Sequence, residues 1–488
     1  MSIAMSGEGR LIVVSSRGPY RFKRHARGVR AERTVGGLVS ALDPVLRRTN
    51  GIWVAWDDGY LPGESLGEHV RVPPDRPQYL FARLFLSDEE VRDFYHGFSN
   101  RGLWPLCHYF LGRCEFDLAE FERYRAVNAR FAQTAAREAK PGDTIFVQDY
   151  QLALVPALLR GMSTGARIAI FWHIPFPPLD TYRALPWREE ILEGILGADV
   201  VGFHTRSYVR HFAACAEQLL GARWDEPAGT LHLGDRRIRL RWCPLGIDFA
   251  EFDRIARMPS TCEKARRIRE GLGTQIVAIG ADRIDYSKGI RERLLGVGHF
   301  LDRHPEFRKR FAFVQVAAPS RTEVQEYRKI GRSIDETVGR VNGRYAEEAW
   351  SPITYFCRAL PRNELVAYYV AADIALVTPL RDGLNLIAKE YVASRPDGDG
   401  ALILSEFAGA AEEMQDALLV NPYDVDDVAD KIYQAIQLSE EDRRRRMGRL
   451  RDLTASRDVA WWQKEFLGDL LGDARRLSPP SREAPSRG

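Results

Sequence analysis

Four basic residues of the 488-residue chain each follow a short apolar run, most of them beside glycine, proline or serine: Arg17, Arg283, Lys288 and Arg321. Arginine offers a planar fork and lysine a point charge, and both suit phosphate oxygens. A hydrogen bond to a charged group contributes roughly 1.5–3 kcal/mol. Four such residues together can hold two phosphate-bearing ligands, although each one alone is equally consistent with an ordinary surface cation.

Parallel β-strands are expected to position these residues. Short runs rich in apolar and β-branched residues recur along the chain and are typical of strands: Leu11–Val14, Thr144–Gln148, Arg167–Trp172, Asp199–Phe203, Ile276–Gly280, Phe313–Ala317, Asp373–Thr378 and Ala401–Leu404. Most are continuously apolar, as in parallel strands covered on both faces. Ligands of such sheets bind beyond the carboxyl ends of the strands. Asp149, His173 and Asp382 also follow strands, so they are candidates for the same site.

Amphipathic stretches alternate with these strands: Leu118–Glu138, Ser207–Leu220, Arg291–His304 and Asn363–Ala372. The alternation predicts a doubly wound α/β architecture. A hairpin-like segment, Gly229–Trp242, leads through Pro244–Asp248 into a second strand–helix series. We therefore expect two α/β halves, residues 1–247 and 248–456, with ligands in the cleft between them. Residues 457–476 should form a C-terminal helix that packs back on the first half, and residues 477–488 should be disordered.

The overall composition excludes several classes of protein. The 70 basic and 67 acidic side chains nearly balance, which argues against a nucleic-acid-binding protein. The six cysteines have no C-x-x-C spacing and are expected to be buried small hydrophobic residues. No segment suits a signal peptide or a membrane span, so we expect a cytoplasmic enzyme without a membrane partner. No G-x-G-x-x-G follows Leu11–Val14 or Ile276–Gly280, which excludes a nucleotide-dependent oxidoreductase.

Some candidate residues also have a purely structural interpretation. Pro175 and Pro177 fix an extended loop after His173, which favours a site residue over a core histidine. Tyr95 and Trp104 belong to an aromatic stretch that, taken alone, is typical of a core.

Three short motifs are equally open to a structural interpretation. Gly36-Gly37 before Leu38 would let the backbone approach a phosphate at a helix N-terminus, but glycine pairs more often mark turns. Asp382 before Gly383 also suits a turn. Asp424-Val425-Asp426 matches a metal-binding D-x-D, yet its place before a helical stretch favours helix capping.

Five longer segments resemble one family, the trehalose-6-phosphate synthases, and stand in that family's order: F-S-N-R-G-L-W-P (98–105), H-I-P-F-P (173–177), R-I-D-Y-S-K-G (283–289), T-P-L-R-D-G-L-N-L-I-A-K-E-Y (378–391) and S-E-F-A-G-A-A-E-E (405–413). The resemblance runs from about Leu11 to the Trp461-Trp462 region. Members of this family are retaining glycosyltransferases. The resemblance implies the α/β GT-B fold, in which two Rossmann-like domains with parallel sheets face a central cleft. The first domain would bind the acceptor and the second the nucleotide sugar.

The resemblance also implies roles for individual residues. The catalytic set would be His173, beside the transferred glucose, with Arg283, Lys288 and Asp382. Acceptor glucose-6-phosphate would meet Arg17, Tyr95, Asp149 and Arg321, with Trp104 as a wall of its pocket. Arg283 and Lys288 would neutralise the donor diphosphate. The other donor contacts would be Gly36 and Gly37 in a flexible loop, Leu360 at the base, Asp382, Gly383, Leu384, Asn385, Leu386, Ile387, Ala388 and Lys389 around the sugar and phosphates, and Glu390 at the ribose.

Two departures from the family pattern lie on the acceptor side. The chain has Ser15-Ser16-Arg17 where the family usually has Ser-Asn-Arg, followed by a basic stretch from Arg21 to Arg33. It has Gln148-Asp149-Tyr150-Gln151 where the family usually has His-Asp-Tyr-His. The donor chemistry is therefore better determined than the identity of the acceptor.

The resemblance predicts transfer of glucose from a nucleoside-diphosphate glucose, with UDP-glucose as first choice, to glucose-6-phosphate. No metal and no other cofactor is expected, because Arg283 and Lys288 fill the role of a divalent ion. Three alternatives stay open: glycerol-3-phosphate as acceptor, a pseudo-glycosyltransferase that joins cyclitols, and a non-catalytic synthase-like regulator. Because the chain keeps the family's acceptor residues and charged residues, we favour an enzyme that uses a hexose phosphate as acceptor. The donor base, any homo-oligomer and any allosteric control stay open.

Overall fold

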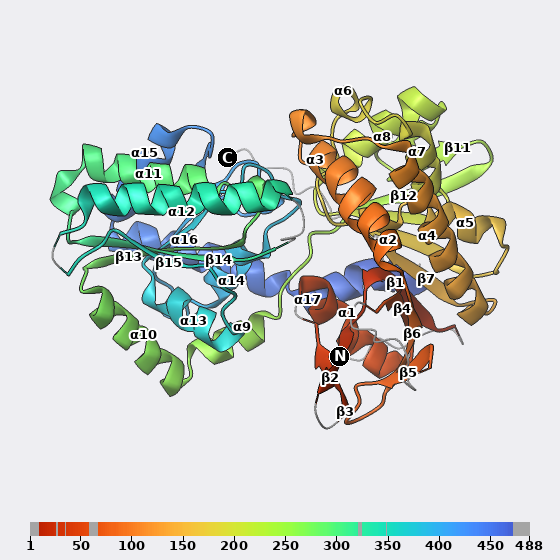
Figure 1. The fold of residues 1–488 in the computed structure, drawn as a ribbon, viewed down its shortest axis with the longest axis horizontal. Helices are drawn as coiled ribbons and strands as arrows, with labels where there is room; N and C mark the ends of the chain where they lie inside the picture. The colour runs from red at the N-terminus through yellow and green to blue at the C-terminus, as the bar shows by residue number, and fades with distance from the viewer. Residues whose placement is uncertain are drawn as a thin grey trace, which may run out of the picture.

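Each half of the chain folds around a β-sheet whose inner strands are the apolar runs of the sequence (Figure 1). The computed structural model describes residues 9–25, 28–34, 36–57, 67–320, 325–347 and 349–471. Strands β7 (Thr144–Gln148) and β8 (Arg167–Trp172) have the predicted bounds. Nearly every residue of both strands is buried, as expected of inner strands covered on both faces.

The sheet of the first half has ten strands, in the order β10-β11-β12-β9-β8-β7-β1-β4-β6-β5. Its further members are β1 (Leu11–Arg17), β4 (Ile52–Trp56), β5 (His69–Val72), β6 (Tyr79–Leu84), β9 (Val200–Phe203), β10 (Arg223–Asp225), β11 (Thr230–Leu233) and β12 (Arg236–Trp242). The strands from β12 to β6 are parallel neighbours, whereas β10, β11 and β5 pair antiparallel. Strand order reverses between β1 and β7, where parallel pairing aligns Leu11 with Thr144. Such a reversal is the usual ligand site of a doubly wound sheet.

The sheet of the second half has six parallel strands, in the order β15-β14-β13-β16-β17-β18. They are β13 (Ile276–Arg283), β14 (Phe311–Ala318), β15 (Ile353–Phe356), β16 (Ile374–Val377), β17 (Ala401–Ser405) and β18 (Leu418–Val420). Numbered within this half, the order is 3-2-1-4-5-6, that of a Rossmann sheet. Its reversal lies between β13 and β16, the strands that precede the Arg283–Lys288 and Asp382–Leu386 segments.

Helices cover both faces of both sheets (Figure 1). In the first half they are α1 (Gly37–Thr49), α2 (Asp88–Glu90), η1 (Val91–Leu103), α3 (Trp104–Cys107), η2 (Leu111–Arg113), α4 (Leu118–Glu138), η3 (Tyr150–Leu152), α5 (Val155–Gly161), α6 (Leu179–Tyr182), α7 (Arg188–Leu196) and α8 (Arg206–Leu220). In the second half they are α9 (Phe249–Ala256), α10 (Pro259–Leu272), η4 (Tyr286–Lys288), α11 (Ile290–Arg303), η5 (Pro305–Phe307), α12 (Gln325–Tyr345), α13 (Arg362–Ala371), α14 (Leu386–Ala393), η6 (Gly409–Glu412), α15 (Val425–Gln437) and α16 (Glu440–Ser456). A separate two-stranded hairpin, β2 (Tyr20–His25) and β3 (Gly28–Arg33), follows β1.

The chain crosses between the halves twice, and the two crossings touch. Val459 donates its backbone N–H to the carbonyl oxygen of Ile247 at 2.9 Å. A Cβ added at Gly246 would lie 2.1 Å from the carbonyl carbon of Asp458, so only glycine allows this approach. The second crossing leads into α17 (Val459–Trp462), η7 (Gln463–Leu467) and α18 (Gly468–Leu471).

These last helices lie under the sheet of the first half, against β7 and β8. The ring of Phe466 is 5.4 Å from that of Phe146 and 5.0 Å from that of Phe171. Gln463 donates to the carbonyl oxygen of Ala41 in α1 at 2.5 Å. Residues 472–476 of the expected C-terminal helix and the expected tail at 477–488 lie outside the described residues.

Two smaller predictions have clear outcomes. Asp424 caps α15 by accepting the N–H groups of Asp426 at 3.0 Å and Asp427 at 3.2 Å, which confirms the capping interpretation. Burial of all the cysteines was wrong for Cys262 and Cys357, which are exposed. Cys262 lies in α10, and Cys357 directly follows the edge strand β15.

Candidate active site between the two halves

A cavity of about 490 Å³ lies where the two strand-order reversals face each other. Asp149 and His173 line it from the first half, and Arg283, Lys288 and Asp382 line it from the second. Both walls are built from segments that follow strands, as predicted from the sequence. The structure thus brings all four expected catalytic residues to one cavity.

The ammonium group of Lys288 contacts a carboxylate of the same half. Its Nζ lies 2.5 Å from Oδ2 of Asp382, and the amide of Asn385 donates to the same oxygen at 3.1 Å. Both side chains of the ion pair are mostly buried, with exposed fractions of 13% and 14%. A diphosphate entering the cavity would therefore compete with Asp382 for Lys288.

The segment that carries Arg283 and Lys288 is fixed by a buried arginine. Arg293 of α11 is fully buried and contacts Asp282 at 2.6 Å, Thr378 at 2.9 Å and the carbonyl oxygen of Lys288 at 3.3 Å. It thereby joins the ends of the two central strands. Burial raises the pKa of Asp282, and the adjacent Arg293 opposes that rise.

The segment after β16 passes close to the first half. A Cβ added at Gly383 would lie 2.1 Å from the carbonyl oxygen of His173, so only glycine fits between the halves. Tyr208 of α8 donates its hydroxyl to the carbonyl oxygen of Asp382 at 3.1 Å. Asn385 has φ of 77° and caps α14 through Ile387 N–H at 3.1 Å.

Most of the other residues predicted to contact the donor line the apolar part of the cavity. Gly37, Leu360, Leu384, Leu386 and Ile387 line it, together with Asn385. Gly36 precedes α1 with extended backbone and open space around its Cα. A Cβ at Gly37 would lie 2.6 Å from Leu386, which brings the start of α1 against the second half.

Three predicted donor residues in α14 have different surroundings. Ala388 is fully buried in the core. Lys389 is buried, donates to the carbonyl oxygen of Leu245 at 2.9 Å and pairs with Glu413 at 2.6 Å. Its ammonium thus holds the linker, the Pro244–Asp248 segment that joins the two halves. The side chains of Ala388 and Lys389 therefore do not line the cavity, and their donor role stays a prediction. Glu390 accepts from the hydroxyl of Tyr369 at 3.3 Å, and burial raises the pKa of Glu390 to about 7.

Two of the predicted acceptor residues, Arg17 and Tyr95, form a cation–aromatic cluster with Trp56 at the end of β1. The guanidinium of Arg17 lies 4.7 Å from the ring centre of Tyr95 and 5.9 Å from that of Trp56. The guanidinium of Arg283 lies 5.9 Å from the ring of Trp104. Trp104 of the first half thus lies beside the cationic segment of the second.

Asp149 is held in a strained conformation at the end of β7. Its φ of 71° and ψ of 173° lie in a region that non-glycine residues rarely adopt. Its carboxylate accepts the backbone N–H of His173 and that of Tyr150, both at 3.0 Å. These bonds fix the carboxylate at the edge of the cavity and tie it to the loop that carries His173.

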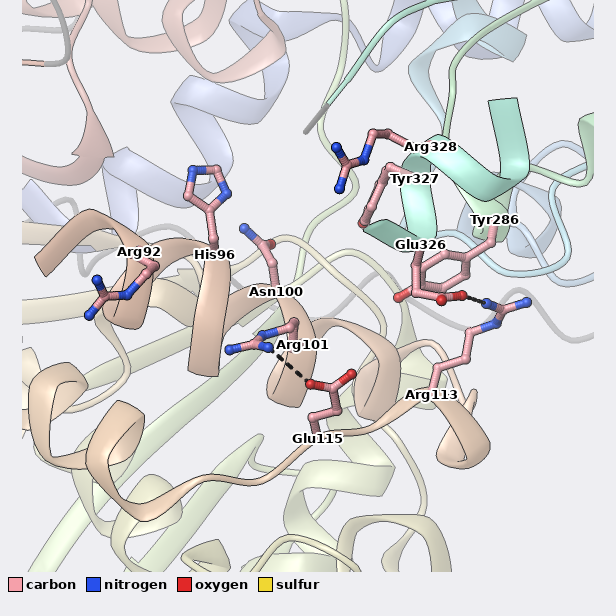
Figure 2. A pocket seen from close by; sticks show the side chains of 10 residues that line it. All are labelled: Arg92, His96, Asn100, Arg101, Arg113, Glu115, Tyr286, Glu326, Tyr327 and Arg328. Atoms are coloured by element: carbon pink, nitrogen blue, oxygen red, sulfur yellow. Dashed lines mark hydrogen bonds and ion pairs between the residues drawn. The ribbon is translucent and has the colours of Figure 1, made fainter. Parts of the chain in front are cut away.

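A second cavity, of about 360 Å³, lies between η1 and the start of α12 (Figure 2). Its lining is mostly charged or aromatic: Arg92, His96, Asn100, Arg101, Arg113, Glu115, Tyr286, Glu326, Tyr327 and Arg328. Arg113 pairs with Glu326 of the other half at 2.7 Å, and Arg101 pairs with Glu115 at 3.0 Å. Sequence reasoning missed this cavity, because its residues lie on helix faces and not at strand ends.

Arg321, the fourth predicted phosphate ligand, lies outside the described residues. Gln148 and His204 are the functional candidates that the prediction missed. His204 directly follows strand β9, so the rule used for the other strands would have found it. The sequence marks Gln148 only as a departure from the family pattern.

Two further properties concern ions and membranes. Among the described residues, three or more His, Cys, Asp or Glu side chains nowhere gather as ligands for a metal ion. None of the helices in the described part of the chain combines the length and apolar character that a membrane span requires.

Comparison with known proteins defines the class. The model of glycosyltransferase family 20 matches residues 9–471, so the chain belongs to this family of glycosyltransferases. It is similar to proteins named trehalose-6-phosphate synthase. The one from Mycobacterium marinum is 42% identical over 485 residues, which cover 97% of this chain and 96% of that protein. The one from Mycolicibacterium smegmatis is 41% identical over 475 residues, which cover 96% and 93%.

Solved structures give the same result. A UDP-forming alpha,alpha-trehalose-phosphate synthase from Burkholderia xenovorans, in complex with glucose-6-phosphate, superimposes with a TM-score of 0.86 at 33% identity, over 95% of this chain and 100% of that chain. An E. coli structure bound with UDP-2-fluoro glucose gives 0.85 at 32% identity, over 95% and 99%. These likenesses confirm the predicted family and its α/β GT-B architecture.

Proposed function

We propose that this chain transfers glucose from UDP-glucose to glucose-6-phosphate, which gives α,α-trehalose-6-phosphate and UDP. The observation that carries this proposal is the cavity between the two strand-order reversals, with Lys288 and Arg283 on one wall and Asp149 and His173 on the other. The related structures hold glucose-6-phosphate or UDP-2-fluoro glucose. Two anionic substrates suit a cleft with basic groups at both sheets.

The reaction breaks the bond between the sugar C1 and the diphosphate oxygen and forms a bond from C1 to the acceptor hydroxyl oxygen. We infer that the acceptor attacks on the face that the nucleotide leaves, so that the configuration at C1 is retained. The acceptor proton passes to the departing phosphate oxygen. Lys288 and Arg283 stabilise the negative charge that develops on the leaving group. Glycosidases use a pair of carboxylates that flank the scissile bond. No two carboxylates among the predicted site residues are assigned to such a pair.

In this proposal the leaving group needs no metal ion, because Arg283 and Lys288 line the wall of the cavity where the diphosphate would bind. Lys288→Ala should lower turnover at least about tenfold, since a preorganised cation is lost. A chelator should leave the wild-type rate unchanged. Activity that disappears in chelator and returns with magnesium would contradict this part of the proposal.

A matrix of substrates tests the proposed function. Purified protein is mixed with UDP-, ADP- and GDP-glucose, each crossed with glucose-6-phosphate, glycerol-3-phosphate and glucose, and the released nucleoside diphosphate is measured. UDP-glucose with glucose-6-phosphate should be the fastest pair. A higher rate with glycerol-3-phosphate would assign the acceptor site to a smaller substrate, and inactivity with every pair would refute transferase function.

Arg17 provides the test of the acceptor site. Arg17→Ala should lower kcat/KM for glucose-6-phosphate about tenfold to a hundredfold, the worth of one charged hydrogen bond. The rate with unphosphorylated glucose should not change. Equal losses with both acceptors would show that Arg17 is structural. The matching role of Arg321 stays a prediction.

We also infer that the protein acts in the cytoplasm. The argument is chemical: nucleotide sugars and sugar phosphates are intracellular metabolites, and both are the proposed substrates.

A further inference from the structure

A row of side chains runs through the ends of three adjacent strands behind the cavity. Gln148 ends β7, His173 follows β8 and His204 follows β9, and these strands are parallel neighbours. His173 Nε2 lies 3.0 Å from Oε1 of Gln148, and His173 Nδ1 lies 3.3 Å from Nε2 of His204. His204 Nδ1 accepts the backbone N–H of Leu245, in the linker, at 3.4 Å. Both nitrogens of His173 thus face protein groups.

From the backbone groups at its two ends we infer the direction of this row. At one end, Leu245 N–H can only donate, so His204 Nδ1 carries no proton and His204 Nε2 does. At the other end, the amide nitrogen of Gln148 donates to the carbonyl oxygen of Phe146 at 3.3 Å, which turns Oε1 toward the imidazole. Oε1 can only accept, so His173 carries its proton on Nε2. The two assignments meet without conflict at His173 Nδ1, which accepts from His204.

The surroundings favour neutral rings. Burial lowers the pKa of His173 to about 3. Burial, with the neighbouring His173 and Lys389, lowers the pKa of His204 well below its usual value, against a hydrogen bond to the backbone of Cys243. The charged groups that face this row are Asp149 beside the His173 loop, Lys288 and Asp382 across the cavity, and Lys389 with Glu413 behind the linker. The carboxylate of Asp149 is occupied by backbone N–H groups, including that of His173 itself.

We propose that Gln148 and His204 are positioning residues that hold His173 as a neutral ring with its proton on Nε2. The inference rests on the proposed function in one respect, namely that His173 lies beside the transferred sugar. A ring held in this way serves as a fixed polar wall and does not take the acceptor proton, which leaves the departing phosphate as the proton acceptor.

The row also joins the ring to the contact between the two halves. Leu245 gives its N–H to His204 of the first half, and its carbonyl oxygen accepts from Lys389 of the second half at 2.9 Å. Lys389 is held in turn by Glu413 at 2.6 Å, and Arg457 contacts Glu413 at 3.1 Å. A change in how the halves meet would therefore reach His173 through Leu245.

The first experiment observes the protons directly. Protein labelled with ¹⁵N at its ten histidines is studied by long-range ¹H–¹⁵N correlation, which distinguishes the two neutral tautomers from the charged ring. The spectra of His173→Ala and His204→Gln assign the signals. His173 and His204 should both show a protonated Nε2 and a bare Nδ1 between about pH 6 and 8. A protonated Nδ1 or a charged ring at either residue would overturn the proposal.

The second experiment asks whether Gln148 acts through His173. Gln148→Met keeps the length of the side chain but removes its acceptor, and should lower kcat about tenfold by releasing the ring. In a His173→Ala background the same change should have no further effect, because residues that act as a unit are not additive. Gln148→His should restore most of the rate, since an imidazole nitrogen can also accept. The Kd for UDP should be the same in all variants.

Equal losses from Gln148→Met in both backgrounds would show a merely structural role and would overturn the proposal. Melting temperatures of each variant separate loss of fold from loss of positioning. Failure of the proposed function is a different result. In that case wild-type protein is inactive with every substrate pair, while the tautomers of His173 and His204 are still read from the spectra.

Discussion

Lys288 has a carboxylate partner in the same place where the donor diphosphate should bind. The 2.5 Å contact pairs the ammonium with the carboxylate of Asp382. We expect a bound diphosphate to displace Asp382 from Lys288, which would free the carboxylate to accept from sugar hydroxyls. After transfer, renewed contact between Asp382 and Lys288 would favour release of the nucleotide.

This exchange predicts opposite effects on binding and turnover for Asp382→Asn. Removing the competing charge should tighten binding of UDP by at least about fivefold, since a charged hydrogen bond to Lys288 no longer has to be broken. Turnover should fall, because the sugar loses its carboxylate partner. Calorimetric titration with UDP and steady-state rates measure the two effects.

Lys288→Ala supplies the control for this exchange. In that background Asp382→Asn should leave UDP affinity unchanged, because no ammonium remains to compete for. Unchanged UDP affinity of Asp382→Asn in the wild-type background would refute the exchange.

The buried carboxyl group of Glu390 leads us to expect that kcat/KM for the donor depends on pH. Burial raises its pKa to about 7, against the hydrogen bond from Tyr369 and the attraction of Arg362. A carboxylate that accepts from two ribose hydroxyls must be ionised, so kcat/KM for the donor should rise with pH and level off above about pH 8. Glu390→Gln should give a lower rate that is flat over this range. A wild-type profile without a rise near neutrality would contradict the ribose role.

The same residue should affect stability with the opposite sign. The folded pKa of Glu390 lies above its ordinary value of 4.5, so the folded state binds more protons between the two values. The contribution of Glu390 to the free energy of unfolding is therefore largest at low pH and is lost as pH rises through about 7. Glu390→Gln should accordingly be more stable than wild type at pH 8 in urea denaturation.

At the level of the elements, the strand-end rule led to five residues that line the cavity: Asp149, His173, Arg283, Lys288 and Asp382. β7, β8 and α4 have the predicted bounds because their apolar patterns are long and uninterrupted. Arg17 and Arg283 are the last residues of β1 and β13, so each charge stands at a sheet edge. Residue types at strand ends could be read from the sequence because parallel strands place all their carboxyl ends together.

The sequence did not predict the outer strands. Two of these strands are short apolar runs: Ile52–Trp56 follows a helix, and Tyr79–Leu84 follows a cis Val72–Pro73 bond. In such short runs the spacing of apolar residues does not distinguish a strand from a buried helix. Without β4 and β6 the strand-order reversal at β1 could not be located. The orientation of Lys389 was also out of reach, because it depends on a linker carbonyl that is far away in the sequence.

The position of Gly383 leads to a prediction about how closely the two halves must approach each other. Gly383→Ala would place a methyl group 2.1 Å from the His173 carbonyl oxygen and push the walls of the cavity apart. A displacement of about 1 Å should lower kcat/KM by roughly a hundredfold while each half stays folded. Steady-state kinetics and the radius of gyration from X-ray scattering measure the loss and the opening.

The matched control is Gly448→Ala in the middle of α16, where an added Cβ meets no atom within 4 Å. It should stabilise the protein by up to about 1 kcal/mol through helix propensity and leave the rate unchanged. Full activity of Gly383→Ala would show that the halves meet differently during catalysis.

For the whole molecule, one hydrophobic core joins the two halves. Trp462 is fully buried, with its ring 5.4 Å from that of Phe171 and 6.3 Å from that of Phe146. Trp462→Ala should therefore cost about 3–5 kcal/mol of unfolding free energy. Its neighbour Trp461 is only half-buried against Arg457, so Trp461→Ala is the control and should cost much less. Equal losses in denaturant titrations would contradict this placement of the C-terminal helices.

The position of these helices also sets an order of events during synthesis. The strands that contain Phe146 and Phe171 leave the ribosome long before the helices that contain Trp462 and Phe466. At about 5–20 residues per second, the stretch between the two crossings alone takes roughly 10–40 s to translate. During that interval the part of the first sheet around Phe146 and Phe171 lacks the cover of the C-terminal helices. A nascent chain that stalls there exposes an aromatic surface to chaperones and to its neighbours on the same messenger.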